Sequence, residues 1–417
     1  MHPLYIIYFF LSPLIFIIIL IISLFNKKIR AHLMMQNKTI QSALNTNLKN
    51  PIIFHAASAG EFEQIKPLLR KRSVNQPILQ TFFSPTIYNK EKKSKLFDAC
   101  CYHPFDFPWS AYYFFKKIAP KKYIINRHDI WPHHIFFAKL FKIKIIYINA
   151  NLKSNSSRLR PVFKGFHKWL FHQIDIIIVP SDEIKKRFIA NFETTNILTF
   201  KDTRFEQIKY HILKNTRIPG IDNLLKKKNI VLGSIDRHDW SVILESIKNT
   251  KLDKFNLIIV PHEINQKFIN SIIADIKELR LKVDRITNIN HKNNTTKPEN
   301  VKLNCIIYDK VGDLLDLYKY APLAYVGCGF STGVHNISEP ALQGCYVSYG
   351  PNISLLDEAI KLKKHKLSKI IYNSADFTDF TNIENNGFLI KNREKITKLF
   401  KGKNDDFNKL INRIYEA

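Results

Sequence analysis

A serine and a glutamate stand three residues apart in the segment His55–Glu61, which has the sequence HAASAGE and directly follows an apolar run. This S-x-x-E spacing fits a capping box, in which the two side chains satisfy free N–H groups at the start of a helix. Glu61 could act instead as a general base, because a carboxylate within hydrogen-bond reach of a hydroxyl can remove its proton. Gly60 would then let a substrate approach the backbone closely. The residues alone leave both interpretations of Glu61 open.

A glycine-rich turn joins another apolar run to a predicted helix in Val326–Pro340, VGCGFSTGVHNISEP. The N–H groups of such a turn and of a helix start suit a phosphate or another anion. Asn336 and Glu339 repeat a cap-like spacing, so helix capping is the alternative, and a carboxylate here could also accept hydrogen bonds from ribose hydroxyls. The turn fits neither G-x-G-x-x-G with a suitably spaced acid nor G-x-x-x-x-G-K-[ST], which disfavours dinucleotide and P-loop sites.

Two arginines each follow a predicted strand, Arg127 in NRHDIWP and Arg204 in DTRFE. An arginine at the end of a strand is more often a surface residue than a functional one. Two that lie at the same edge of a sheet could nevertheless hold a phosphate bidentately.

The spacing of histidines and cysteines predicts no metal site. The chain has no H-E-x-x-H and no C-x-x-C pair, and five of its histidines are scattered: His103, His128, His133, His262 and His335. The five cysteines are Cys100, Cys101, Cys305, Cys328 and Cys345, and we interpret them as reduced thiols of a cytosolic compartment.

The elements that would position these residues alternate between short apolar strands and amphipathic helices, which is typical of parallel α/β sheets. A first series of strands is predicted at Ile52–His55, Ile78–Phe83, Tyr123–Asn126, Ile143–Asn149, Ile176–Pro180 and Ile197–Phe200. A second is predicted at Asn229–Leu232, Asn256–Val260, Cys305–Tyr308, Leu323–Val326 and Cys345–Ser348. Helices are expected at Glu63–Lys71, Ala111–Ile118, His133–Phe141 and Asp182–Asn191, and the polar segment Asn288–Asn300 is expected to be a surface loop.

We therefore predict an N-terminal segment 1–26, a doubly wound domain over 27–215, a linker over 216–228 with Pro219 and Gly220 as a break, and a second doubly wound domain over 229–417. Ligands of open parallel sheets bind beyond the carboxyl ends of the strands, which predicts a cleft between the two domains.

The N-terminal segment is predicted to span a membrane. Leu4–Phe25 contains no charged side chain, and its length suits the hydrocarbon core of a bilayer. Lys27, Lys28 and Arg30 follow it, so the positive-inside tendency places the rest of the chain in the cytoplasm. A cleaved signal peptide is the alternative, but no small-x-small cleavage site follows.

The chain is strongly basic, with 64 Lys and Arg against 35 Asp and Glu and a net charge of +29. Such a charge is compatible with nucleic acid, which binds basic surfaces by counterion release. The lysines are scattered rather than gathered into one arm, so we favour an anionic lipid surface and expect no nucleic acid.

Eleven short motifs in order resemble the 3-deoxy-D-manno-octulosonic acid (Kdo) transferases of lipopolysaccharide synthesis, from the anchor to about Asn352. They are HAASAGE (55–61), FFSPT (82–86), YHPFDFP (102–108), DIWP (129–132), NANLKSNSS (149–157), DTRFE (202–206), GS (233–234), VPHE (260–263), VGDLLDLY (311–318), GCGFSTGVHNISEP (327–340) and YGPN (349–352). The resemblance implies a membrane-anchored GT-B glycosyltransferase with two Rossmann-like doubly wound domains, an N-terminal one for the acceptor and a C-terminal one for the CMP-sugar.

The resemblance also implies a reaction and residue roles. Kdo would move from CMP-Kdo to a glucosamine hydroxyl of the lipid A precursor, with inversion, at the cytoplasmic face of the inner membrane and without a cofactor or metal. Glu61 matches the catalytic base of the family, and Arg204 and Arg127 match positions that stabilise the transition state. The residues that match CMP-binding segments are Pro261, His262, Val311, Gly312, Asp313, Asn336, Ile337, Ser338 and Glu339.

The chain departs from the family pattern at several motif positions. Arg127 stands where the family usually has an acid, and Cys328 replaces the second glycine of a common Gly-Gly pair. Ile87 and Lys201 each replace a glycine, and IDRHD follows Gly233-Ser234 instead of threonine and acidic residues. Two alternatives stay open: another inner-membrane GT-B glycosyltransferase that uses a UDP-sugar, and a membrane-tethered basic binding protein.

Overall fold

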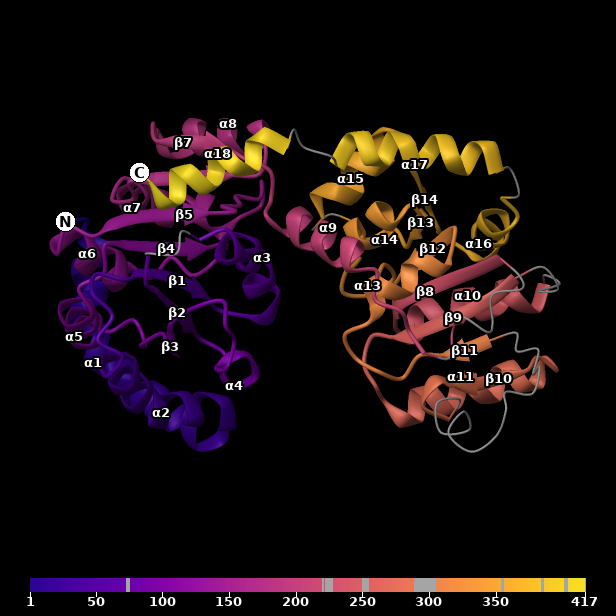
Figure 1. Cartoon of the computed structure of the whole chain (residues 1–417), viewed down its shortest axis with the longest axis horizontal. Helices are drawn as coiled ribbons and strands as arrows, with labels where there is room; N and C mark the ends of the chain where they lie inside the picture. The colour runs from indigo at the N-terminus through magenta and orange to yellow at the C-terminus, as the bar shows by residue number, and fades with distance from the viewer. Residues whose placement is uncertain are drawn as a thin grey trace. The chain divides into compact units, whose positions relative to one another are not determined.

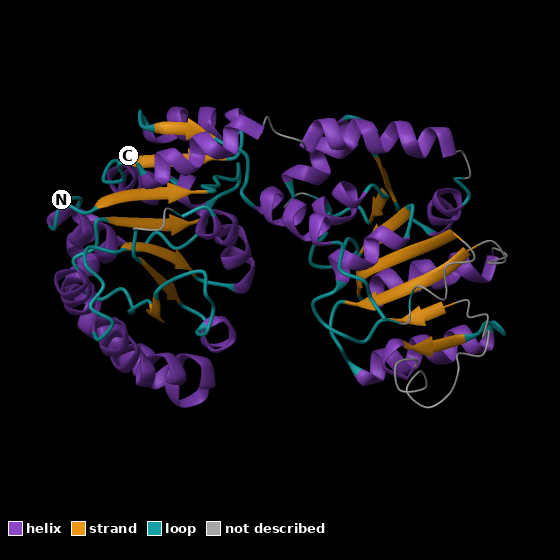
Figure 2. Cartoon of the chain, viewed as in Figure 1, coloured by secondary structure: helices purple, strands orange, loops and turns teal. Residues whose placement is uncertain are grey.

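The computed structural model describes residues 1–72, 76–219, 221, 228–249, 255–288, 305–353, 356–383, 386–400 and 404–416. The chain divides into two compact units. The N-terminal unit holds residues 1–207 together with 403–417, and the C-terminal unit holds residues 208–402. Each unit is a parallel sheet with helices packed on its faces, as Figure 2 shows by the colours of strands and helices.

The sheet of the N-terminal unit has seven parallel strands in the order β3-β2-β1-β4-β5-β6-β7. Their bounds are β1 Ile52–Ala56, β2 Ile78–Phe82, β3 Ala99–Tyr102, β4 Lys122–Asn126, β5 Lys144–Ile148, β6 Ile176–Val179 and β7 Ile197–Thr199. The chain runs from β1 outward to β3 and then returns to β4 on the other side of β1, where Ile52 pairs with Lys122. The strand order therefore reverses between β1 and β4, the point at which ligands of such sheets bind.

Apolar side chains alternate along these strands and build a core on each face of the sheet. On one face, Ile53 and Tyr123 pack with side chains of α2, α5, α6, α7 and α8. On the other, Phe54 and Ile124 pack with side chains of α3, α4 and α18. The helices of this unit are α1 Pro3–Phe25, α2 Lys27–Leu44, α3 Ala59–Arg70, α4 Pro85–Glu91, α5 Pro108–Ile118, α6 Pro132–Leu140, α7 Pro161–Phe171, α8 Asp182–Phe192 and α18 Asn404–Tyr415, with a 3-10 turn at Ser157–Leu159.

Helix α1 is long and apolar enough to cross a membrane, and most of its surface is exposed. One polar stripe faces the folded unit instead. The Tyr8 hydroxyl donates to Asp106 Oδ2 at 3.0 Å, and both ring nitrogens of His133 lie within hydrogen-bond distance of α1, Nε2 3.0 Å from Ser12 Oγ and Nδ1 3.1 Å from Tyr5 Oη. These contacts seat part of the helix against the unit and leave its apolar faces uncovered.

The sheet of the C-terminal unit also has seven parallel strands, in the order β10-β11-β9-β8-β12-β13-β14. Their bounds are β8 Lys228–Ile235, β9 Phe255–Pro261, β10 Val283–Arg285, β11 Cys305–Ile307, β12 Leu323–Val326, β13 Tyr346–Tyr349 and β14 Ser368–Ile370. The order reverses between β8 and β12, where Gly233 pairs with Val326. A second ligand crevice is therefore expected at the carboxyl ends of these two strands.

Two cores cover the faces of this sheet as well. Trp240 of α10, Ile272 of α11 and Phe377 of α16 share one core, and Ile221, Leu317 and Tyr318 share the other. The helices are α9 Arg204–Lys214, which begins in the N-terminal unit, α10 Arg237–Asn249, α11 Gln266–Glu278, α13 Leu314–Leu317, α14 Ser338–Gln343, α15 Asp357–Lys364, α16 Ser374–Thr381 and α17 Asn386–Phe400, with a 3-10 turn at Tyr318–Tyr320.

The expected alternation of strands and helices is present, and every predicted strand overlaps an observed one. Three strands were missed: β3, β10 and β14. The segment expected to be a surface loop, Asn288–Asn300, lies outside the described residues except for Asn288.

The observed boundaries of the two units differ from the expected ones in two places. Residues 403–417 belong to the N-terminal unit rather than to the second domain, because Leu410 and Ile414 of α18 are buried against its sheet. Figure 1 shows this helix, in yellow, beside the sheet of the N-terminal unit. Within the expected linker 216–228, Ile218 and Ile221 are buried in the core of the C-terminal unit, so this part of the chain belongs to a folded core.

Candidate functional site

Glu61 lies in the first turn of α3, directly after the carboxyl end of β1. Ser58 caps this helix, and its Oγ accepts the N–H of Glu61 at 3.4 Å. The Glu61 side chain turns back so that Oε2 accepts the Ala57 N–H at 2.7 Å. The capping interpretation of the S-x-x-E spacing is thus confirmed, with Ala57 as the partner, and the residue is 5% exposed.

The surroundings of Glu61 favour the protonated form of its carboxyl group. Burial raises its pKa, and the negative charge of Asp129 raises it further. The hydrogen bond from Ala57 and the positive charges of His55 and Arg127 oppose this effect without cancelling it. A carboxylate whose pKa is raised is a stronger proton acceptor when ionised, so the cap does not exclude the second interpretation of Glu61.

His55 and Asp129 form a pair beside Glu61. His55 is fully buried at the end of β1, with Nε2 3.2 Å from Asp129 Oδ2 and Nδ1 3.0 Å from Thr81 Oγ1. Burial alone would raise the pKa of Asp129, but the hydrogen bond and charge of His55 hold it below its ordinary value. Neither residue was singled out from the sequence, although both lie inside the HAASAGE and DIWP motifs.

Arg127 follows β4 and adopts a left-handed backbone conformation, with φ of +61°. Its N–H donates to the Ile148 carbonyl at 3.0 Å, and its own carbonyl accepts the Tyr147 hydroxyl at 2.6 Å. Such a conformation is uncommon for a residue other than glycine and is held here by hydrogen bonds on both sides. Arg127 therefore sits at the switch point of the sheet, close enough to lower the pKa of Glu61 by its charge.

Arg204 is the first residue of α9 and is paired with Asp202. Nη2 lies 3.4 Å from Asp202 Oδ2, and the Arg204 N–H donates to Asp202 Oδ1 at 2.8 Å. Gln64, one turn after Glu61 on α3, donates to both oxygens of Asp202 at 3.2 Å. Asn126, the residue before Arg127, donates to the Glu61 carbonyl at 2.9 Å and to Gln64 Oε1 at 3.1 Å. The three predicted catalytic residues thus belong to the N-terminal unit. Hydrogen bonds through Asn126, Gln64 and Asp202 join Glu61 to Arg204, whereas Arg127 is connected to them as the chain neighbour of Asn126.

The glycine-rich turn lies at the switch point of the C-terminal unit, after β12. A Cβ atom on Gly327 would lie 2.2 Å from the Ser234 carbonyl, and one on Gly329 would lie 2.5 Å from the Gly350 nitrogen. The close packing of three backbone segments therefore requires glycine at both positions.

The predicted CMP-binding residues after this turn are partly structural. Asn336 Nδ2 donates to Glu339 Oε1 at 2.8 Å, and Asn336 Oδ1 accepts the Ser338 N–H at 3.0 Å. Asn336 therefore makes local hydrogen bonds just before α14, whereas the N-cap position of this helix is held by Ile337, which makes no side-chain cap bond. Ile337 is fully buried, so its side chain is part of the core.

The other predicted CMP-binding residues follow β9 and β11. Pro261 ends β9, and His262, which is exposed, donates its N–H to the Ile235 carbonyl at 2.8 Å. Val311 is 85% exposed, Gly312 has a φ of +112°, and Asp313 accepts a hydrogen bond from the Tyr308 hydroxyl. All nine predicted CMP-binding residues lie in the C-terminal unit, whereas the three predicted catalytic residues lie in the N-terminal unit.

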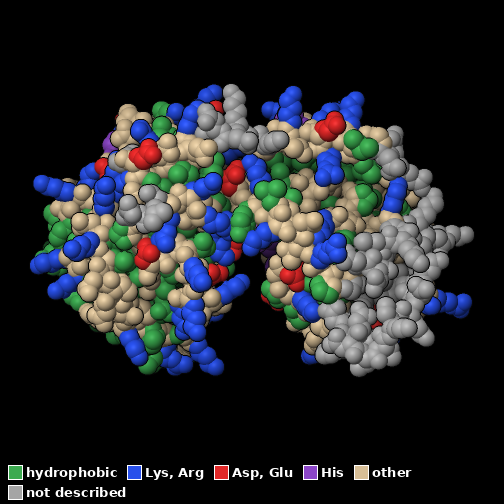
Figure 3. Space-filling model, in the orientation of Figure 1, with side chains coloured by type: hydrophobic (Ala, Val, Ile, Leu, Met, Phe, Trp, Pro, Cys, Tyr) green, Lys and Arg blue, Asp and Glu red, His purple; other side chains and the backbone are tan. Residues whose placement is uncertain are grey.

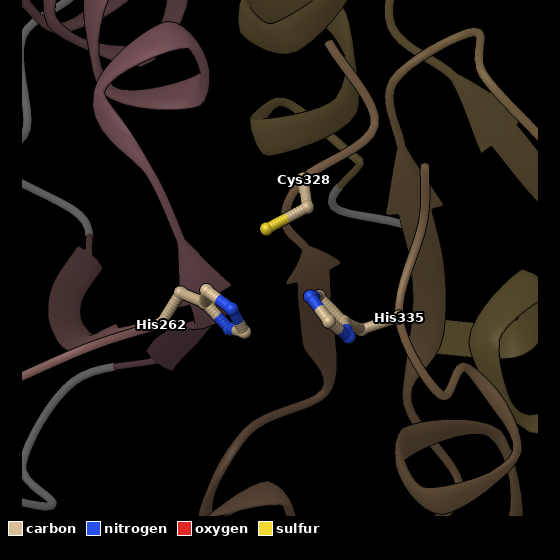
Figure 4. A group of neighbouring side chains, drawn as sticks. All are labelled: His262, Cys328 and His335. Carbon is tan, nitrogen blue, oxygen red and sulfur yellow. The ribbon is translucent and has the colours of Figure 1, made fainter. Parts of the chain in front are cut away.

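The fold also brings together side chains that the spacing along the chain had separated. The imidazole rings of His262 and His335 stack with centroids 4.4 Å apart. Cys328 completes a group whose ligand atoms all lie within 4.8 Å of one another (Figure 4). The prediction of no metal site was based on local spacing, which does not detect residues that meet only after folding.

Lys and Arg side chains are spread over the visible face of the space-filling view in Figure 3 and outnumber the acidic ones there. This agrees with the scattered distribution of lysines along the chain. On this face the basic side chains are therefore spread out rather than gathered in one narrow groove.

Comparison with known proteins identifies relatives over most of the chain. Residues 27–207 match the family model described as 3-deoxy-D-manno-octulosonic-acid transferase (kdotransferase). The chain is 29% identical to 3-deoxy-D-manno-octulosonic acid transferase of Aquifex aeolicus, over 85% of this chain and 86% of that protein. It is 26% identical to the enzyme of the same description from Haemophilus influenzae, over 69% of this chain and 68% of that protein.

Solved structures share the fold at low sequence identity. MurG of Acinetobacter baumannii matches with a TM-score of 0.55 and 12% identity, over 88% of this chain and 100% of that one. The S. aureus MnaA-UDP co-structure matches with a TM-score of 0.56 and 10% identity, over 88% of this chain and 96% of that one. These likenesses confirm the expected GT-B class of fold, two parallel Rossmann-like units in one chain.

Proposed function

We propose that this chain, a glycosyltransferase similar to Kdo transferases, moves Kdo from CMP-Kdo to a glucosamine hydroxyl of the lipid A precursor. The observation that carries the proposal is the match of residues 27–207 to the Kdo transferase family model. That range covers most of the N-terminal unit and contains Glu61, Arg127 and Arg204.

In the proposed reaction, Glu61 accepts the proton of the acceptor hydroxyl as its oxygen attacks the anomeric carbon of Kdo. The new glycosidic bond forms while the bond from that carbon to the CMP phosphate breaks, and CMP leaves with the electron pair. A direct displacement of this kind inverts the anomeric centre. The raised pKa of Glu61 supports its role, because it brings the proton affinity of the carboxylate closer to that of the group it must deprotonate.

Arg204 and Arg127 are proposed to offset the negative charge that develops on the departing phosphate. Preorganised donors of this kind are worth about 3 kcal/mol each in comparable sites. The pair with Asp202 supports the assignment of Arg204, because a guanidinium held at a fixed place loses little freedom when the transition state forms.

The C-terminal unit is proposed to bind CMP-Kdo through its glycine-rich turn and the nine predicted residues. The position of the turn at the switch point between β8 and β12 supports this proposal. Glu339 and Asp313 are the carboxylates among the nine, and carboxylates suit the hydroxyls of a ribose or of the sugar.

The lipid acceptor would be reached from the membrane. We propose that α1 holds the protein in the bacterial inner membrane with its body on the cytoplasmic side, where Lys27, Lys28 and Arg30 meet anionic lipid. The exposed apolar faces of α1 support this location, since they would otherwise be in contact with water.

Mass spectrometry of the lipid after incubation with purified protein and CMP-Kdo tests the proposal. We expect a lipid whose mass has increased by one or more Kdo residues, together with release of CMP. The absence of Kdo from the lipid, or release of UDP from a UDP-sugar in the same assay, would contradict it. The second result would favour the alternative that uses a UDP-sugar.

A further inference from the structure

Three side chains that carry metal-binding atoms converge in the C-terminal unit, and we name them the His-Cys-His cluster: His262, Cys328 and His335. They come from three segments, the one after β9, the turn after β12 and the segment that precedes α14. Figure 4 shows the two imidazole rings side by side with the sulfur near them, and the ligand atoms of the three residues lie within 4.8 Å of one another.

The backbone of each residue in the cluster is held by a neighbouring segment. The His262 N–H donates to the Ile235 carbonyl at 2.8 Å, and the His335 N–H donates to the Gly327 carbonyl at 3.4 Å. The Cys328 N–H donates to Asp239 Oδ2 at 2.6 Å. Because these contacts fix the three Cα positions, only side-chain rotations are needed to bring the donors closer together.

Cys328 occupies a backbone conformation that disfavours a side chain. Its φ is +64°, in the left-handed region where glycine is preferred. A residue with a Cβ at such a place costs on the order of 1 kcal/mol, and such strain is most often retained at functional sites. The resemblance also leads us to expect glycine here, so the thiol is a departure in this chain, and it faces two imidazoles.

Two further observations favour a bound ion. His335 Nε2 is buried and has no hydrogen-bond partner within the described part of the chain, so this nitrogen is available to bind a metal ion. His262 is exposed, which gives an ion a path from solvent.

We propose that His262, Cys328 and His335 bind one zinc ion, with a fourth position open to water or to another ligand. One sulfur and two imidazole nitrogens are donors that zinc prefers, whereas calcium and magnesium prefer oxygen. Bond lengths of about 2.3 Å to sulfur and about 2.0 Å to nitrogen place tetrahedral donors roughly 3.5 Å apart, so the donor atoms close in by up to about 1.3 Å. The thiol proton passes to solvent when the zinc–sulfur bond forms.

Cobalt titration of the full-length protein tests the proposal directly. The protein is purified in detergent without a histidine tag, treated with a chelator, and titrated with Co²⁺, which reports thiolate ligation by a charge-transfer band and coordination geometry by its visible spectrum. We expect one equivalent of Co²⁺ to produce both signals and one equivalent of Zn²⁺ to remove them. The absence of a thiolate band would overturn the proposal.

Variants assign the signal to the cluster. Cys328→Gly removes the sulfur and relieves the left-handed strain, so the protein should keep or raise its unfolding temperature while metal affinity falls by at least about 100-fold. His262→Ala and His335→Ala should weaken binding similarly. Cys100→Ser and His365→Ala change the same residue types elsewhere and should leave the titration unchanged. A thiolate band that persists in Cys328→Gly, or that disappears in Cys100→Ser, would overturn the proposal.

Discussion

His55 and Asp129 are paired at the switch point of the N-terminal sheet, with His55 Nε2 3.2 Å from Asp129 Oδ2. Asp129 in turn raises the pKa of Glu61 by its negative charge. The pair therefore connects a fully buried imidazole at the end of β1 to the electrostatics of the proposed base, and it gives the activity a predictable dependence on pH.

Asp129→Asn should shift the acid limb of the pH–rate profile to lower pH. Glu61 must be ionised to accept a proton, so turnover falls as pH drops through its pKa, which lies above the ordinary 4.5. Removal of the Asp129 charge lowers that pKa, and turnover then persists to lower pH. Measured kcat against pH checks this, with Asp379→Asn, an exposed carboxylate elsewhere, as the control for net charge. A limb that stays in place or moves to higher pH would show that Asp129 does not act on the base.

Glu61→Gln should abolish most of the transfer without unfolding the protein. The amide oxygen of glutamine can still accept the Ala57 N–H, so the cap is kept, while loss of a general base costs about 10²- to 10⁴-fold in kcat. Binding of CMP-Kdo, measured by calorimetry, should be retained.

The matched control separates capping from catalysis. Ser58→Ala removes the bond to the Glu61 N–H and should lower the free energy of unfolding by about 1 kcal/mol. Its turnover should remain near the normal value. Normal transfer by Glu61→Gln would show that Glu61 caps the helix and does not act as the base.

Arg204→Gln should lower kcat by about 10²- to 10³-fold, because a preorganised donor to the departing phosphate is lost. Its ion pair with Asp202 is largely buried but long, at 3.4 Å, so we expect little change in stability. Arg204→Lys keeps the charge without the planar fork and should be intermediate. Arg72→Gln, which breaks an arginine–carboxylate pair elsewhere in the unit, should keep its kcat; an equal loss in both variants would contradict the assignment.

Lys122 should make the stability of the protein depend on alkaline pH. Its ammonium is buried in β4 and donates to the carbonyls of Ile414 and Tyr415 at 2.8 and 3.1 Å. Burial lowers the pKa of Lys122 to about 8, with Lys121 and Lys144 adding to the effect. The folded state therefore favours the neutral amine. Below pH 8 the side chain is charged in both the folded and the unfolded state, and its burial lowers the free energy of unfolding by the full amount. This penalty is relieved as the pH rises from about 8 toward 10.5.

Comparison with Lys122→Met isolates this contribution. The free energy of unfolding of the natural protein, minus that of Lys122→Met, should increase with pH across this range in urea titrations. Lys93→Met, which alters an exposed lysine elsewhere in the N-terminal unit, should show the natural pH dependence. A difference that is independent of pH would mean that Lys122 is not held as described.

The sequence was informative wherever local pattern determines structure. Strands such as Ile52–Ala56 and Phe255–Pro261 are buried on both faces and are therefore continuous apolar runs, which are readily recognised. Strand β3 was missed because Ala99–Tyr102 is short and contains two cysteines, and β10 and β14 because each has three residues, includes charged side chains and lies at a sheet edge.

The remaining features depend on contacts between distant residues. Motif spacing identified Glu61 and Asn336, but the hydrogen bonds that their side chains make and the pairing of His55 with Asp129 required the fold. The meeting of His262, Cys328 and His335 and the packing of α18 on the N-terminal sheet follow from tertiary structure alone. Local periodicity carries no information about which distant segment an amphipathic helix will cover.

The return of the chain to its first unit determines when that unit can finish folding. The sheet from β1 to β7 emerges early in synthesis, yet Tyr415 donates to the Leu68 carbonyl at 2.9 Å and Ile414 lies in the same core. Until the ribosome releases α18, the part of this sheet face that α18 covers stays open to water and to chaperones. A chain that stopped before α18 would therefore leave incomplete the unit that is synthesised first.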